Sequence, residues 1–113
     1  MLKEFIECPN ALVAVLGGEI DQYSAAYLRS KIDIETELSD KRNLVLDLTN
    51  VSFMDSAGIG LIIGRAKNLA SIGGRVAIAG AGNGLRKILE LSGVTRFACV
   101  YPDYRTAAED MRR

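Results

Sequence analysis

The sequence predicts an α/β domain in which a mixed, mostly parallel sheet of about five strands packs against about four helices. Strand-like and helix-like segments alternate along most of the chain, which is the pattern of β-α-β units. The apolar run 44–48 is typical of a buried strand, and the residues that follow it have the apolar spacing of a helix. Pro9-Asn10 is a turn sequence between two apolar segments, so we expect an antiparallel strand pair at the N-terminal edge.

The individual elements follow from their apolar spacing and from the turn residues between them. The first helix has Ser24 as a candidate N-cap, and Ile32 follows Leu28 by one helical turn, so both lie on one face. Right-handed crossovers should place the carboxyl ends of the parallel strands along one rim. The expected elements are strands at 2–7, 11–20, 44–48, 75–79 and 97–101, and helices at 24–38, 56–71, 85–91 and 104–111.

Length and composition bound the possible classes of function. A chain of 113 residues with 49% hydrophobic residues is expected to form one domain over 1–113 with one core. Lys and Arg together number 14, as do Asp and Glu, so no net charge attracts nucleic acid or an anionic membrane. No apolar run approaches the roughly 18 residues of a membrane span. We therefore expect a cytoplasmic protein without nucleic-acid or membrane partners.

The absence of histidine excludes several kinds of chemistry. Ser-His-Asp and Cys-His catalysis and the common zinc sites all require this residue. Cys8 and Cys99 are isolated and have neither metal-site nor redox-pair spacing, so buried thiols are expected. Ser56 is not in a nucleophile elbow, because Met54 stands where that motif needs glycine. The sequence therefore indicates a protein that is not an enzyme and that uses neither metal nor cofactor.

The turn at Asp55 and Ser56, between the central strand and the second helix, does not look like ordinary packing. Either residue is a good N-cap. Gly58, Gly60 and Gly64 then fall within the expected helix, where each glycine lowers stability by about 0.5–1 kcal/mol relative to alanine. Gly60 and Gly64 share one helical face, so the close approach of another backbone is expected there, from the protein's own sheet or from a partner.

Several segments resemble the STAS-domain anti-sigma factor antagonists, and in particular the sporulation members of that family. The central motif is Ser52-Phe53-Met54-Asp55-Ser56-Ala57-Gly58-Ile59-Gly60. It is accompanied upstream by Gly17, Glu19, Ile20 and Asp21, and downstream by Ile72-Gly73-Gly74 and Leu91-Ser92-Gly93. The resemblance covers nearly the whole chain and implies a STAS-like fold.

The resemblance also implies a function as a switch in transcription regulation. The unmodified form of such a protein binds an anti-sigma factor that is also a serine kinase, and so releases the sigma factor. Phosphorylation of the motif serine, here Ser56, inactivates the antagonist, and a serine phosphatase reverses the modification. The acidic loop residue of the family matches Asp21, which is therefore expected to contact the partner together with Asp55, Ser56, Gly58 and Gly60.

The chain departs from the sporulation members at two places. Ala57 replaces a second serine, which leaves Ser56 as the only local acceptor, and Gln22-Tyr23 stands where histidines are expected. Antagonists of stress-response systems share the serine motif, so the resemblance leaves the sporulation and stress-response pathways both open.

The residues around Ser56 suit this role on physical grounds. A phosphate adds a charge of about −1.5 to −2, and a helix N-terminus offers N–H donors and a partial positive charge to it. The modified domain should therefore stay folded, while an interface that buries the phosphate should be lost. Gly58 and Gly60 are expected to leave the surface around Ser56 open to a kinase.

The glycine-rich loop 80–84 supports an alternative function as a small nucleotide- or ligand-binding regulatory domain. The loop follows an expected strand and precedes an expected helix, and Asp103 lies at a distance suited to a ribose-binding acid. Leu85 stands at the third glycine position of the dinucleotide motif, and the second half of a dinucleotide-binding fold is missing.

Overall fold

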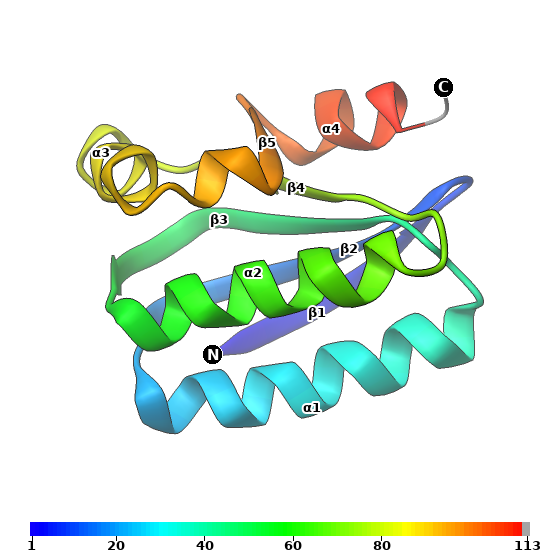
Figure 1. Ribbon diagram of the computed structural model, residues 1–113, viewed down its shortest axis with the longest axis horizontal. Helices are drawn as coiled ribbons and strands as arrows, with labels where there is room; N and C mark the ends of the chain where they lie inside the picture. Colours follow the sequence, from blue (N-terminus) through cyan, green and yellow to red (C-terminus); the bar gives the residue numbers. More distant parts are fainter. Residues whose placement is uncertain (112–113) are drawn as a thin grey trace.

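A five-stranded sheet in the order β1-β2-β3-β4-β5 forms the centre of the protein, which a computed structural model describes for residues 1–111 (Figure 1). The strands β1 and β2 pair antiparallel, whereas β2 with β3, β3 with β4 and β4 with β5 pair parallel. The strands therefore occupy the sheet in the order in which they occur in the chain. This topology confirms the predicted fold class, including the antiparallel pair at the N-terminal edge.

Strands and helices alternate after the first strand pair. The strands are β1 (Leu2–Cys8), β2 (Ala11–Ile20), β3 (Leu44–Met54), β4 (Val76–Ala79) and β5 (Ala98–Tyr101). The helices are α1 (Gln22–Ser39), α2 (Ser56–Ala70), α3 (Asn83–Ser92) and α4 (Tyr104–Asp110), with a 3-10 turn at Val94–Arg96.

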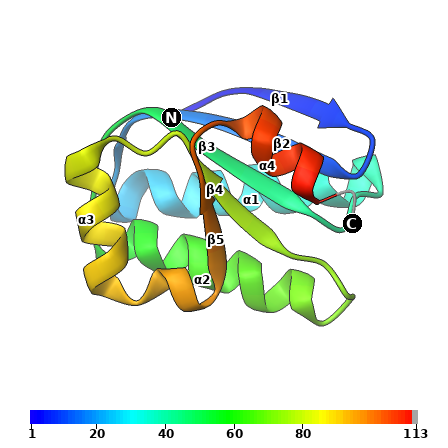
Figure 2. The ribbon, with the colours of Figure 1, turned by 90° about the horizontal axis from the view of Figure 1, so that it is seen from above.

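The helices cover the two faces of the sheet unequally. Figures 1 and 2 show α1 and α2 side by side on one face and α4 alone on the other. Within β2, Leu12 and Leu16 belong to the larger core under α1 and α2, while Val13 packs in the smaller core with Ala107 of α4. Burial of both faces explains why β2 reads as a continuous apolar run instead of an alternating one.

Two boundaries differ from the sequence-based expectation. The strand β3 extends to Met54 instead of ending at Leu48, because its second half continues to pair with the end of β2. Only Val51 and Met54 are buried in that half, so it has no apolar run to reveal it. The helix α1 begins at Gln22 with Asp21 as its N-cap, so the expectation that Ser24 is the N-cap is wrong.

No helix within residues 1–111 is both long enough and apolar enough to cross a lipid bilayer. This finding concerns the described helices alone.

The turn after α2 depends on a close approach between two backbone segments. A Cβ atom placed on Gly74 would lie 1.8 Å from the carbonyl oxygen of Arg42, and the Gly74 N–H donates to the carbonyl of Leu69 at 2.7 Å. The contact is with backbone atoms, which cannot turn aside as a side chain does. By contrast, a Cβ atom on Gly64 would meet no atom within 4 Å.

We expect alanine substitutions at these two glycines to change stability in opposite directions. Gly74→Ala should lower the free energy of unfolding by about 1–3 kcal/mol, because the loop must move to admit the methyl group. Gly64→Ala should raise it by about 0.5–1 kcal/mol, since it restores helix propensity in open space. Urea denaturation of both variants measures the two changes. Equal stability of Gly74→Ala and the wild-type protein would contradict this account of the turn.

Candidate functional site

The pairing of β2 with β3 brings two helix N-termini to one rim of the sheet. Ile20 and Met54 are the last register partners of the two strands, and each is followed by an aspartate that caps a helix. The backbone N–H of Asp55 donates to the carbonyl of Ile20 at 3.2 Å, so the two chain segments are joined at this rim. Asp21 and Asp55 consequently lie on the same rim, at the starts of α1 and α2 (Figure 1).

The N-cap of α2 is Asp55, and Ser56 is the first residue of the helix. The carboxylate of Asp55 accepts a hydrogen bond from the backbone N–H of Ala57 at 2.8 Å. Ser56 is exposed, and its hydroxyl forms no hydrogen bond with any other residue within 1–111. The structure thus gives the capping role to Asp55 and leaves the Ser56 hydroxyl free at the surface.

The helix donors near Ser56 are partly occupied. Asp55 takes the Ala57 N–H with its side chain, and its carbonyl oxygen accepts from Gly58 and Ile59 at 3.1 and 3.2 Å. A group added to Ser56 therefore competes with the Asp55 carboxylate for the Ala57 N–H. The partial positive charge of the helix N-terminus acts on it in either case.

Asp21 caps α1 through a capping box. One carboxylate oxygen, Oδ1, accepts from the backbone N–H groups of Tyr23 and Ser24, both at 3.0 Å, and the Ser24 hydroxyl accepts from the Asp21 N–H at 3.0 Å. The backbone N–H of Ser24 is the largest cause that holds the pKa of Asp21 below its usual value. The second oxygen, Oδ2, accepts no hydrogen bond from the described residues, so Asp21 has an acceptor left for a partner.

The two glycines of the expected contact set have different surroundings. Gly60 is exposed, and a Cβ atom there would meet nothing within 4 Å. Gly58 is buried, and a Cβ atom there would lie 2.2 Å from Cγ of Met54 and 3.1 Å from Cγ2 of Ile20. The prediction that Gly58 leaves the surface open is therefore wrong, because its missing side chain lets α2 approach the strand ends.

A shallow hollow of about 270 Å³ lies between α1 and α2 beside Gly60. Small side chains surround it, so the helix surfaces next to Ser56 are low. The residues that line it are Ala25, Ala26, Arg29, Ala57, Gly60 and Leu61.

Exposed aromatic side chains near Asp21 were not found by the sequence reasoning. Tyr23 is 81% exposed and Tyr27 is 54% exposed, and both line a hollow with Met1 and Lys3 at the start of the chain. They lie one helical turn apart on α1, a spacing that places them on one face and that signals a surface patch. Aromatic residues of this kind are common anchors of protein interfaces.

The glycine-rich loop 80–84 has structural reasons for two of its glycines. Gly80 has a φ of +73°, and a Cβ atom there would lie 2.1 Å from Oγ1 of Thr49. Thr49 in turn donates to the buried carboxylate of Asp47 at 2.6 Å. Gly82 is the N-cap of α3. These contacts account for the two glycines without a nucleotide.

The comparison with known proteins agrees with this fold and site. The STAS domain family matches the chain over residues 3–107. The chain therefore belongs to the STAS-domain family. Within it, the chain is similar to an anti-sigma F factor antagonist of Paenibacillus polymyxa, with 29% identity over 102 residues, which are 90% of this chain and 87% of that protein.

Two solved structures of the anti-sigma factor antagonist SpoIIAA have a similar fold. The unphosphorylated form matches with a TM-score of 0.80 at 22% identity, covering 97% of this chain and 96% of that one. The phosphorylated form, from Bacillus, matches with a TM-score of 0.71 at 25% identity, covering 97% and 98%.

The capping role of Asp21 predicts a specific dependence of stability on pH. Because its pKa is lowered in the folded state, the carboxylate stabilises the fold fully above the unfolded pKa of about 3.9. This contribution is lost as the pH falls through the lower folded value. We therefore expect the difference in free energy of unfolding between the wild-type protein and Asp21→Asn to become less favourable to the wild type below about pH 4. Urea denaturation from neutral to acidic pH tests this, and a difference that is constant with pH would contradict it.

Proposed function

We propose that this protein is an anti-sigma factor antagonist whose unmodified form binds an anti-sigma factor and so releases the sigma factor. The observation that carries the proposal is the free, exposed hydroxyl of Ser56 at the N-terminus of α2. The similarity to the Paenibacillus antagonist over 90% of the chain supports it. In this role the protein is a binding switch and not an enzyme.

The proposed switch is phosphorylation of Ser56 by a partner that is also a serine kinase. The kinase transfers the γ-phosphoryl group of ATP to Oγ of Ser56, and the hydroxyl proton leaves with the kinase base. Exposure of Ser56 gives the kinase access to that oxygen. A serine phosphatase later hydrolyses the phosphoester and returns the protein to its binding form. The solved phosphorylated form of SpoIIAA supports this cycle.

The proposed docking face is the rim that carries Ser56. Asp55 and Asp21 border it, and Gly60 keeps the adjoining surface of α2 low. Gly58 contributes from beneath the surface by fixing the distance of α2 from the strand ends. Tyr23, beside Asp21, is an additional candidate anchor because of its exposure.

A phosphate on this face affects folding and binding differently. In the free protein it is hydrated and lies at the positive end of α2, so the domain remains folded. In the complex it would be desolvated beside the carboxylate of Asp55 without a cationic partner of its own. A loss of about 3–4 kcal/mol, which is modest for a buried unpaired charge, weakens binding by more than about a hundredfold.

The proposal also covers the setting of the switch. We infer a single STAS domain over 1–113 that acts in the cytoplasm, where sigma factors and their regulators meet. The balance of 14 basic and 14 acidic residues supports a protein partner over nucleic acid or membrane. The sporulation pathway is favoured by the similarity to an anti-sigma F factor antagonist.

The proposal predicts that Ser56→Asp keeps the fold and loses the partner. Its melting temperature should stay close to that of the wild type, since an acidic residue is favourable in the first turn of a helix. Its affinity for the anti-sigma factor should fall by about a hundredfold. Isothermal titration calorimetry with the purified anti-sigma factor measures this loss.

Two further variants make the experiment specific. Ser30→Asp adds the same charge at an exposed position in the middle of α1, outside the proposed face, and should bind like the wild type. Ser56→Ala should bind as well but should not be phosphorylated by the kinase. Wild-type affinity of Ser56→Asp, or phosphorylation of Ser56→Ala at the wild-type rate, would overturn the proposal.

A further inference from the structure

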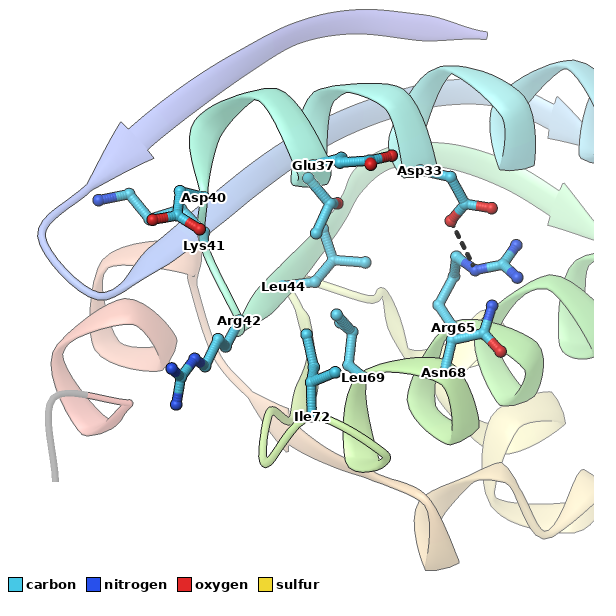
Figure 3. A pocket seen from close by; sticks show the side chains of 11 residues that line it. Asp33, Glu37, Asp40, Lys41, Arg42, Leu44, Arg65, Asn68, Leu69 and Ile72 are labelled. Carbon is cyan, nitrogen blue, oxygen red and sulfur yellow. Dashed lines mark ion pairs between the residues drawn. The ribbon is translucent and has the colours of Figure 1, made fainter.

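A cavity of about 540 Å³ lies at the end of the molecule opposite Ser56, between the C-terminal halves of α1 and α2 (Figure 3). Its volume is in the range of small-molecule sites, roughly 300–1,000 Å³. Leu44 at the start of β3 and Leu69 and Ile72 at the end of α2 form its apolar part. The proposed switch at Ser56 makes no use of this cavity.

Arg65 on α2 lines the cavity and is an unusual buried cation. The residue is only 6% exposed, and its Nε lies 3.0 Å from Oδ1 of Asp33 on α1. This ion pair lacks hydrogen-bond geometry, and neither Nε nor Nη1 donates a hydrogen bond to any of the described residues. Buried polar groups normally have such partners, and a guanidinium carries five N–H donors. Arg65 therefore holds unused donors beside the cavity.

The charge of Arg65 is also incompletely balanced. Burial is the main cause that lowers its pKa; Asp33 opposes this shift and the nearby guanidinium of Arg29 adds to it. The side chain of Asp33 is 48% exposed, so water screens its attraction for the buried guanidinium. The protein thus supplies one half-solvated carboxylate for two neighbouring arginines.

The other charged residues of the lining leave room for an added anion. Arg42, at the far side of the cavity, is exposed and its guanidinium has no ion pair with the described residues. The ammonium of Lys41 donates to the carbonyl of Pro9 at 3.2 Å. Glu37 and Asp40 carry the remaining acidic groups, on the last turn of α1.

We propose that this cavity binds a small organic anion, with a carboxylate or phosphate group on Arg65 and an apolar body against Leu44, Leu69 and Ile72. A planar guanidinium suits both anionic groups because it can donate two parallel hydrogen bonds. In Figure 3 the guanidinium is held by Asp33 and points away from Ile72 and Leu69. Binding therefore requires Arg65 to turn toward the cavity, and the anion of the ligand takes the place of Asp33.

The test is a titration followed by nitrogen-15 NMR with three probes of similar size: benzoate, phenyl phosphate and benzamide. The two anions should shift the Arg65 Nε–H signal and the backbone amides of Leu69 and Ile72. Benzamide, which has the same ring without the charge, should bind at least about tenfold more weakly. The tighter of the two anions identifies the natural ligand group as a carboxylate or a phosphate.

Three variants connect the binding to Arg65. Arg65→Gln should weaken binding of the better anion by at least about tenfold. The matched control Arg86→Gln removes an exposed arginine on α3 that pairs with Glu90 and should leave binding unchanged. Asp33→Asn should tighten binding several-fold, because it removes the competing carboxylate, and it tests the proposal even where Arg65→Gln does not fold.

Three results would overturn the proposal. One is the absence of shifts with either anion up to about 10 mM. Another is binding of benzamide as tight as that of benzoate. The third is weaker binding to Asp33→Asn than to the wild type. Because the cavity and Ser56 lie at opposite ends of α2, none of these results bears on the proposed switch.

Discussion

The parallel pairing of β2 with β3 is the constraint on which the rest of the site depends. It continues through two register irregularities to Ile20 and Met54, where a backbone hydrogen bond from Asp55 to Ile20 closes the rim. Each strand is followed at once by an aspartate that caps a helix, so two helix N-termini begin side by side. Gly58 completes the arrangement, because any side chain there would push α2 away from Met54. The position of Ser56 is thus set by the sheet and not by a flexible loop.

This arrangement separates structural work from chemical work at neighbouring positions. Asp55 and Asp21 satisfy the helix donors, so neither the Ser56 hydroxyl nor the second carboxylate oxygen of Asp21 is needed to hold the fold. A modification of Ser56 therefore acts on whatever covers the rim before it acts on the domain. The opposite end of the α1 and α2 pair has another character, since Arg65 is buried there with an incomplete set of partners. The two ends of the same helix pair are therefore suited to different ligands.

Much of the fold could be predicted because burial on both faces leaves continuous apolar runs such as 11–16 and 44–48. The strand ends were harder, since residues 49–54 pair with β2 through backbone bonds while most of their side chains face solvent. The motif pointed correctly to an exposed Ser56, but it could not tell which glycine faces outward and which packs inward. That difference depends on Met54 and Ile20, which come from two strands. The buried pairing of Arg65 with Asp33 joins two helices far apart in sequence, so no local pattern announces it.

The central claim is that Ser56 accepts a dianion without unfolding the helix that it begins. Amide hydrogen exchange of α2, compared between the unmodified protein and the protein phosphorylated at Ser56, tests it most directly. The account predicts that protection of residues 61–70 is unchanged within about threefold and that differences are confined to the first turn, where the phosphate and Asp55 compete for the Ala57 N–H. Loss of protection along the whole of α2 would show that the modification acts by melting the helix, and would contradict the account.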